Sequence, residues 1–172
     1  MTDTEVRPSS PEPEEEHLQD EDTTIVLAAI DTSNLASRVV DLAARVARRT
    51  WNNAQLHLVH VVRLARFDRP KQSGIRREEV IAEAKNYLDY YVRIARRQCP
   101  APVTGHLAEG DPVDEILRRA RSLSADLVMV GTHDTVGLER FLLGSVAEKI
   151  VRRAPCPTLV VRVKQRAYTK VS

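Results

Sequence analysis

The feature that most constrains the fold is a regular alternation of short apolar runs and longer amphipathic stretches after residue 23. Short runs rich in Val, Ile and Leu are typical of buried strands, whereas apolar residues recurring every three or four positions are typical of helices. Strands that alternate with helices predict an α/β fold, with an open, Rossmann-like, five-stranded parallel sheet and helices on both faces. The expected strands are residues 24–30, 54–62, 103–108, 125–130 and 158–163.

Local signals place the ends of the elements between these strands. The third strand has the weakest pattern, because Gly105 interrupts it. Asp111 followed by Pro112 predicts the cap and first position of a helix. Ser145 and Glu148 have the spacing of a capping box, in which the serine would cap the last helix. Residues 63–74 are basic and are expected to form a loop.

The first 22 residues differ in composition from the rest of the chain. They contain nine acidic residues, one arginine and several prolines, while the net charge of the whole chain is +2. Such a segment buries too little apolar surface to offset the entropy of ordering. We therefore expect a disordered acidic tail over residues 1–22, one domain over residues 23–164 and a flexible end over residues 165–172.

Cysteine usage and hydropathy bear on the compartment. The two cysteines, Cys99 and Cys156, form no C-x-x-C pair and no metal-ligand spacing, which fits a reducing compartment. The N-terminal segment lacks the apolar region of a signal peptide, and no run of about 18 apolar residues is present. We expect a cytoplasmic protein without membrane segments.

The candidate ligand site lies where the carboxyl ends of the strands meet, because ligands of open α/β sheets bind there. Asp31, Thr32 and Ser33 follow the first strand, and Val61 lies near the end of the second. After the fourth strand, a loop beginning at Gly131 leads to Gly144 and Ser145 at the start of a helix. A helix start favours phosphate binding. The alternative is that these glycines only permit turns and that Ser145 only caps its helix.

One long stretch makes a family resemblance specific. The segment GTHDTVGLERFLLGSVAEKIVRRAPCPTLVV, together with the first strand and its Asp31-Thr32-Ser33, resembles the universal stress protein family over roughly residues 23–164. The resemblance implies the strand order 3-2-1-4-5, with the pocket between strands one and four. It also implies a homodimer through the last strand, which a charged substitution at Val161 would separate.

The resemblance further implies an ATP site. Family members that bind ATP carry G-x2-G-x9-G-[S/T], which Gly131, Gly144 and Ser145 match. The resemblance implies that Asp31 contacts the nucleoside, that the Val61 backbone faces the adenine, and that the residues of the glycine motif line the phosphates. The expected cofactor-binding residues are Asp31, Thr32, Ser33, Val61, Gly131, His133, Asp134, Gly144, Ser145 and Val146.

Asp134 is the departure from that motif, because it replaces the second glycine. A carboxylate about 4 Å from a phosphate charge would repel it by roughly 4 kcal/mol at an effective dielectric constant of about 20, before screening and mobility reduce the effect. Two functions therefore stay open. The first is a stress-response regulator that binds ATP, with or without Mg²⁺ or Mn²⁺, has at most slow hydrolysis and acts on an unknown protein partner. The second is a dimeric interaction protein without nucleotide.

Other classes find little support in the sequence. No G-x4-G-K-[ST] motif is present, and no glycine precedes Gly74, which excludes a P-loop and a dinucleotide-binding fingerprint. A phosphoacceptor receiver domain would share the fold plan, but Ala108-Glu109-Gly110 offers no acceptor aspartate. The scattered histidines do not predict a metal site. Aromatic residues make up only 4% of the chain, so its basic residues favour a solvated face over a nucleic-acid interface.

Overall fold

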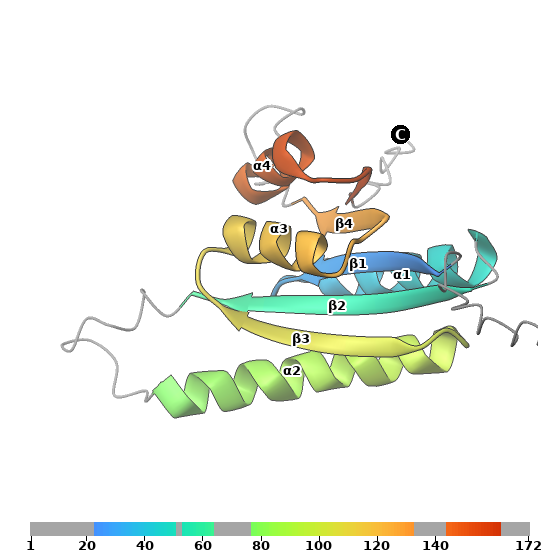
Figure 1. Cartoon of the computed structure of the whole chain (residues 1–172). Coiled ribbons are helices and arrows are strands. Elements are labelled where there is room, and N and C mark those ends of the chain that lie inside the picture. Colours follow the sequence, from blue (N-terminus) through green and yellow to red (C-terminus); the bar gives the residue numbers. More distant parts are fainter. Residues whose placement is uncertain (1–22, 51–52, 64–76, 133–143, 163–172) are drawn as a thin grey trace, which may run out of the picture.

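The computed structural model describes residues 23–50, 53–63, 77–132 and 144–162. Strands and helices alternate along the whole described chain, as the sequence predicts (Figure 1). The expected tail 1–22, the end 165–172 and most of the expected loop 63–74 lie outside the described residues. The elements are β1 (Thr24–Ile30), α1 (Ala36–Thr50), β2 (Ala54–Val62), α2 (Arg77–Gln98), β3 (Val103–Glu109), α3 (Pro112–Ser122), β4 (Leu127–Gly131), α4 (Ser145–Arg153) and β5 (Thr158–Val161).

The five strands form one sheet in the order β3-β2-β1-β4-β5, and all neighbouring strands are parallel. Helices α1 and α2 cover one face, and α3 and α4 cover the other (Figure 1). This order and these layers confirm the predicted fold. Among the described residues, no helix is long and apolar enough to cross a membrane.

Two apolar cores lie on opposite faces of the sheet. Val26, Ala28 and Ile30 of β1 belong to the core that α1 and α2 cover, whereas Leu27 belongs to the core under α3 and α4. All four side chains are buried, because helices cover both faces of this central strand. This explains why the first strand reads as a continuous apolar run rather than as an alternating one.

Three strand ends differ from the predicted ones. β4 begins at Leu127 rather than at residue 125, because the backbone of Ala125 still bonds to the end of α3 (N–H to Ala120 O, 2.9 Å). β3 continues one residue further, to Glu109, in register with Val62 of β2. β5 ends at Val161 rather than at residue 163, which lies outside the described residues.

Gly105 lies within β3 and does not interrupt it. A Cβ atom at this position would lie 2.8 Å from Val92 Cγ2 and 3.2 Å from Leu88 Cγ, both on α2. The glycine therefore allows the long helix to pack closely against the edge strand. The local sequence pattern suggested a weak strand because it contains no information about this packing.

Candidate functional site

A cavity of about 630 Å³ opens at the carboxyl ends of the strands. Side chains of β1, β2 and β4 form its floor, and the first turns of α3 and α4 form one wall. Its volume falls in the range of small-molecule sites, and its lining is mostly apolar with a few polar groups. The lining residues are Ala29, Ile30, Asp31, Val39, Val61, Arg63, Pro112, Ile116, Val130, Gly131, Gly144, Ser145, Val146 and Ala147.

Asp31 provides a carboxylate at the mouth of this cavity, directly after the buried β1. Its Oδ1 atom accepts hydrogen bonds from the Ser33 backbone N–H (3.1 Å) and from the Ser33 hydroxyl (2.5 Å). The Ser33 hydroxyl oxygen in turn accepts from the Leu35 N–H at 3.2 Å, just before α1 begins. Ser33 thus orients the Asp31 carboxylate and also bonds to the backbone just before α1. It does not itself line the cavity.

Two side chains from neighbouring elements fix the end of β1. The Tyr87 hydroxyl of α2 donates to the Asp31 carbonyl oxygen, and His60 of β2 bonds through Nδ1 to the Ile30 carbonyl oxygen (2.9 Å). The two rings also contact each other, with centroids 5.2 Å apart. Burial and the neighbouring Tyr91 and Asp31 raise the pKa of Tyr87, so its hydroxyl stays protonated and able to donate. The sequence does not predict this role for Tyr87, because only the fold brings its hydroxyl to the end of β1.

The first turn of α4 provides backbone N–H groups at the other end of the cavity. Gly144 caps this helix without a side-chain hydrogen bond, and Ser145 is its first helical residue. The predicted capping box is therefore wrong, since Ser145 lies one position too far along the chain to act as the cap. The Gly144 N–H itself donates to the hydroxyl of the buried Thr132 (3.2 Å), which joins the helix start to the end of β4.

The start of α3 contributes a feature that the sequence analysis did not assign to the site. Asp111 caps this helix as predicted, accepting from the Val113 N–H at 2.9 Å, and Pro112 occupies its first turn. The second carboxylate oxygen of Asp111 pairs with Arg63 at 3.7 Å. Arg63 lines the cavity directly after β2, so a cation held by a helix cap lies in the cavity wall.

The cavity brings together most of the residues predicted from sequence. Asp31, Val61, Gly131, Gly144, Ser145 and Val146 all line it. Thr32 and Ser33 do not line it; Thr32 is exposed, and Ser33 bonds to Asp31. His133 and Asp134 lie outside the described residues, so their predicted roles stay predictions.

The chemistry of the cavity suits an amphipathic anion better than a bare metal ion. Its apolar floor can accommodate a flat organic ring, while the start of α4 and Arg63 offer N–H donors and positive charge. Within the described part of the chain, no three His, Cys, Asp or Glu side chains lie close enough together to hold a metal ion. The fold and site thus define an open parallel α/β protein with a ligand cavity at the carboxyl end of its sheet.

Comparison with known proteins narrows this class to one family. The model of the universal stress protein family matches residues 23–162, and the chain belongs to this family. A Staphylococcus aureus (strain USA300) protein that carries the name of the same family is 34% identical over 142 residues, which cover 81% of this chain and 84% of that protein.

Solved structures agree with the fold. A universal stress protein from Archaeoglobus fulgidus matches with a TM-score of 0.62 and 26% identity, over 83% of this chain and 96% of its own. A second structure from that organism, described as a complex with dAMP, matches with a TM-score of 0.57 and 28% identity, over 80% of this chain and 96% of its own.

Proposed function

We propose that this protein is a stress-response regulator that binds an adenine nucleotide, most simply ATP, in the cavity between β1 and β4. The observation that carries the proposal is the cavity itself, which combines an apolar floor, the Asp31 carboxylate and the exposed start of α4. The dAMP complex of the Archaeoglobus relative supports the same ligand class. We further propose that occupancy tunes binding to a protein partner.

The residues fit the parts of a nucleotide. In this proposal the base lies on the apolar side formed by Val61, Pro112 and Ile116, and the ribose lies toward Asp31. The phosphates lie against Gly144 and Ser145 at the start of α4, where the N–H groups of the first turn have no partner within the helix and the dipole has its positive end. Mg²⁺ or Mn²⁺ would bind together with the phosphates.

The residue at position 134 supports an alternative function without nucleotide binding. Asp134 stands where ATP-binding relatives have glycine, and its charge would oppose a phosphate. In this alternative the protein is a dimeric interaction module of the stress response that has lost nucleotide binding. Both functions use the same fold, so only a binding experiment separates them.

The test is calorimetric titration of nucleotide-stripped protein with ATP, with and without Mg²⁺ or Mn²⁺. A micromolar Kd supports the proposed site, whereas no heat of binding at millimolar ATP favours the interaction module. Ser145→Ala removes one hydroxyl donor at the phosphate end and is expected to weaken binding by roughly tenfold to a hundredfold, because a hydrogen bond to a charged group contributes about 1.5–3 kcal/mol.

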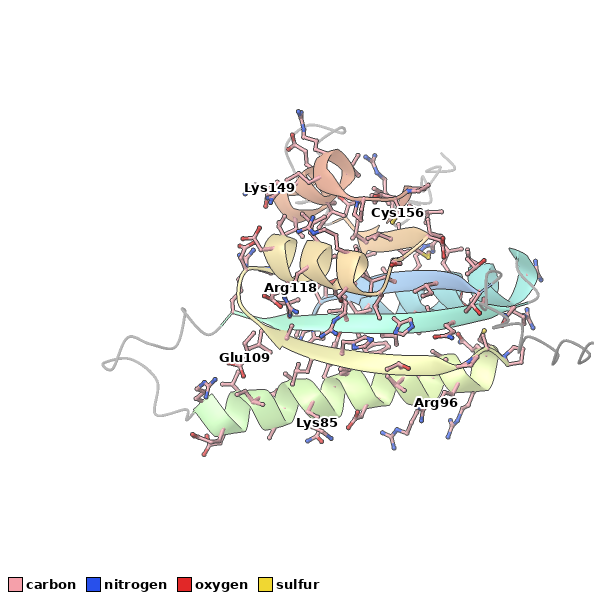
Figure 2. The ribbon with its side chains drawn as sticks, viewed as in Figure 1. Lys85, Arg96, Glu109, Arg118, Lys149 and Cys156 are labelled. Atoms are coloured by element: carbon pink, nitrogen blue, oxygen red, sulfur yellow. The ribbon has the colours of Figure 1, made fainter. Side chains whose placement is uncertain are left out.

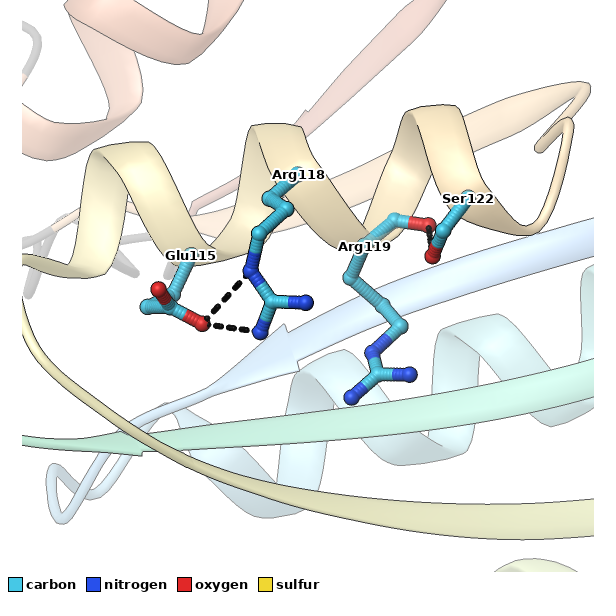
Figure 3. Close-up of polar contacts among 4 residues, drawn as sticks. All are labelled: Glu115, Arg118, Arg119 and Ser122. Atoms are coloured by element: carbon cyan, nitrogen blue, oxygen red, sulfur yellow. Dashed lines mark hydrogen bonds and ion pairs between the residues drawn. The ribbon is translucent and has the colours of Figure 1, made fainter.

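The matched control is Ser122→Ala. Ser122 is exposed at the far end of α3, where its hydroxyl donates to the Arg119 carbonyl oxygen at 3.1 Å (Figure 3). Its loss should leave the Kd for ATP unchanged. Equal weakening by both serine variants would contradict a phosphate site at α4.

Asp134→Gly addresses the substitution directly. If the carboxylate opposes the phosphates, glycine should tighten ATP binding by about tenfold, which corresponds to about 1.4 kcal/mol. An unchanged Kd in a folded variant would show that Asp134 is not an obstacle. If neither wild type nor the glycine variant binds ATP, the nucleotide proposal fails.

A further inference from the structure

The four helices that the structure describes all end at the edge of the sheet opposite the cavity. This follows from the parallel sheet, because each helix runs back from the end of one strand to the start of the next (Figure 1). The last turn of every helix carries two arginines. Positive charge at a helix C-terminus interacts favourably with the helix dipole, so the placement stabilises each helix locally. Together, the arginines of the four helix ends make this edge of the sheet strongly basic.

Four segments join these helix ends to the strands that follow, and we call them the arginine edge: residues 48–54, 96–103, 119–127 and 152–158. They contain eight arginines, no lysine and a single acidic residue, Asp126. The Asp126 carboxylate is itself engaged, because Oδ2 accepts from the Ile25 N–H at 2.7 Å. Figure 2 labels Arg96 toward this end of α2 and Glu109 at the opposite end of the sheet.

Much of this positive charge has no partner among the described residues. Arg152 and Arg153 pair with Glu148 (3.2 Å) and Asp114 (3.4 Å). No ion pair within 4.0 Å joins the exposed Arg48, Arg49, Arg97 or Arg121 to another described residue. Within the part of the chain that the structure describes, the charges of these four arginines are therefore not compensated by an ion pair.

The described chain begins in the middle of this edge. β1 is the central strand, flanked by β2 and β4, so its start lies between the ends of α1 and α3. The Thr24 N–H donates to the Asn53 carbonyl oxygen (2.9 Å), and Asn53 Nδ2 donates to the Thr23 hydroxyl (2.9 Å). These bonds hold Thr23 and Thr24 at the arginine edge.

The segment attached at this point has the opposite charge. Residues 1–22 contain nine acidic side chains and one arginine. A tether of about 22 residues that behaves as a random coil has an end-to-end distance of roughly 25 Å, which corresponds to an effective concentration in the millimolar range. We propose that residues 1–22 dock on the arginine edge of their own chain by charge complementarity. The tail would then shield this edge from outside polyanions.

Energy transfer from Trp51 tests this proposal in the full chain. Trp51 is the single tryptophan and follows Arg49 by two positions in the sequence, and the N-terminal amine can carry a dansyl acceptor. We expect efficient transfer at about 20 mM NaCl that falls by about half at about 500 mM, where the Debye length shrinks to roughly 4 Å. The efficiency should not depend on protein concentration, since the contact is within one chain.

Three variants decide the outcome. Replacing the tail acids by Asn and Gln, or replacing edge charges in R97Q/R121Q, should remove most of the salt-sensitive transfer. R38Q/K85Q also removes two positive charges, but from outside the arginine edge, and should keep the salt-sensitive transfer. The proposal is overturned if wild-type transfer does not respond to salt, or if the two double variants behave alike. It is also overturned if an added nucleic acid binds the edge while transfer stays unchanged.

Discussion

At the scale of single residues, Gly105 limits how α2 can pack. Gly105→Ala would bring a Cβ atom within 2.8 Å of Val92 Cγ2, closer than side-chain carbons approach one another. We expect the free energy of unfolding, measured with urea, to fall by about 1–3 kcal/mol, which is typical of overpacking. An alanine that stabilised the protein would show that the helix moves freely away from the strand.

A second variant tests whether the stability change in Gly105→Ala comes from a steric clash in the folded protein or from reduced flexibility of the unfolded chain. Val92→Ala removes the methyl group that the new Cβ would meet. If overpacking is the cause, G105A/V92A should lose clearly less stability than the sum of the two single variants. Strictly additive losses would rule out this contact as the source.

A pair of histidines under α3 makes stability depend on pH. His57 Nδ1 and His106 Nε2 are 2.8 Å apart, and Arg119 extends from α3 toward the sheet, while Arg118 pairs with Glu115 along the helix (Figure 3). Burial, and then the charge of Arg119, lower the pKa of both rings, and that of His106 falls to about 4. Both histidines are therefore neutral at neutral pH.

The sign of the pH effect follows from proton binding. As pH falls from the ordinary histidine pKa of 6.5 toward about 4, the unfolded chain takes up protons that the folded chain does not. The free energy of unfolding should therefore fall over this range. Between about pH 7.5 and about pH 5 we expect wild type to lose about 1 kcal/mol more than His106→Gln, a value reduced for partial exposure of the ring. Parallel urea titrations check this, and identical pH profiles would contradict it.

At the scale of elements, the start of α3 links helix stability to the cavity. Asp111 caps the helix and also pairs with Arg63 in the cavity wall. Asp111→Ala should reduce the free energy of unfolding by about 1 kcal/mol, which is typical of a lost cap. Asp111→Asn keeps the cap and removes the charge, so it should preserve stability while changing ATP affinity. Calorimetry and urea unfolding measure the two effects, and equal destabilisation by both variants would show that the cap is not the main role.

At the scale of the whole molecule, the sequence predicted the fold because short apolar runs, typical of strands, alternate with stretches in which apolar residues recur at helical spacing. The sequence also predicted the cavity residues that follow β1 and β4, since parallel strands end at one edge. It did not predict Tyr87 or Arg63, because their contacts with Asp31 and Asp111 depend on how distant elements pack. The capping box was wrong because the helix begins at Ser145, one residue earlier than the pattern requires, so that Gly144 is the cap.

The predicted dimer also belongs to this scale, and the structure changes how it is tested. β5 has a strand neighbour on one side only, and an open edge strand favours pairing with a second copy. Val161, the position expected to separate the copies, is only 2% exposed within its own chain, so a charge there would disrupt the core. Val160 is half-buried on the same strand and is the better probe.

We expect light scattering to give wild type twice the chain mass of 19.3 kDa and Val160→Lys a mass close to one chain. The reason is that a second copy would bury the lysine charge without a partner. Val151→Lys is the control, because Val151 is 47% exposed on α4 rather than on the edge strand. Circular dichroism establishes that both variants are folded. A folded Val160→Lys protein that keeps the dimer mass would move the interface away from β5, and a monomeric wild type would refute the dimer.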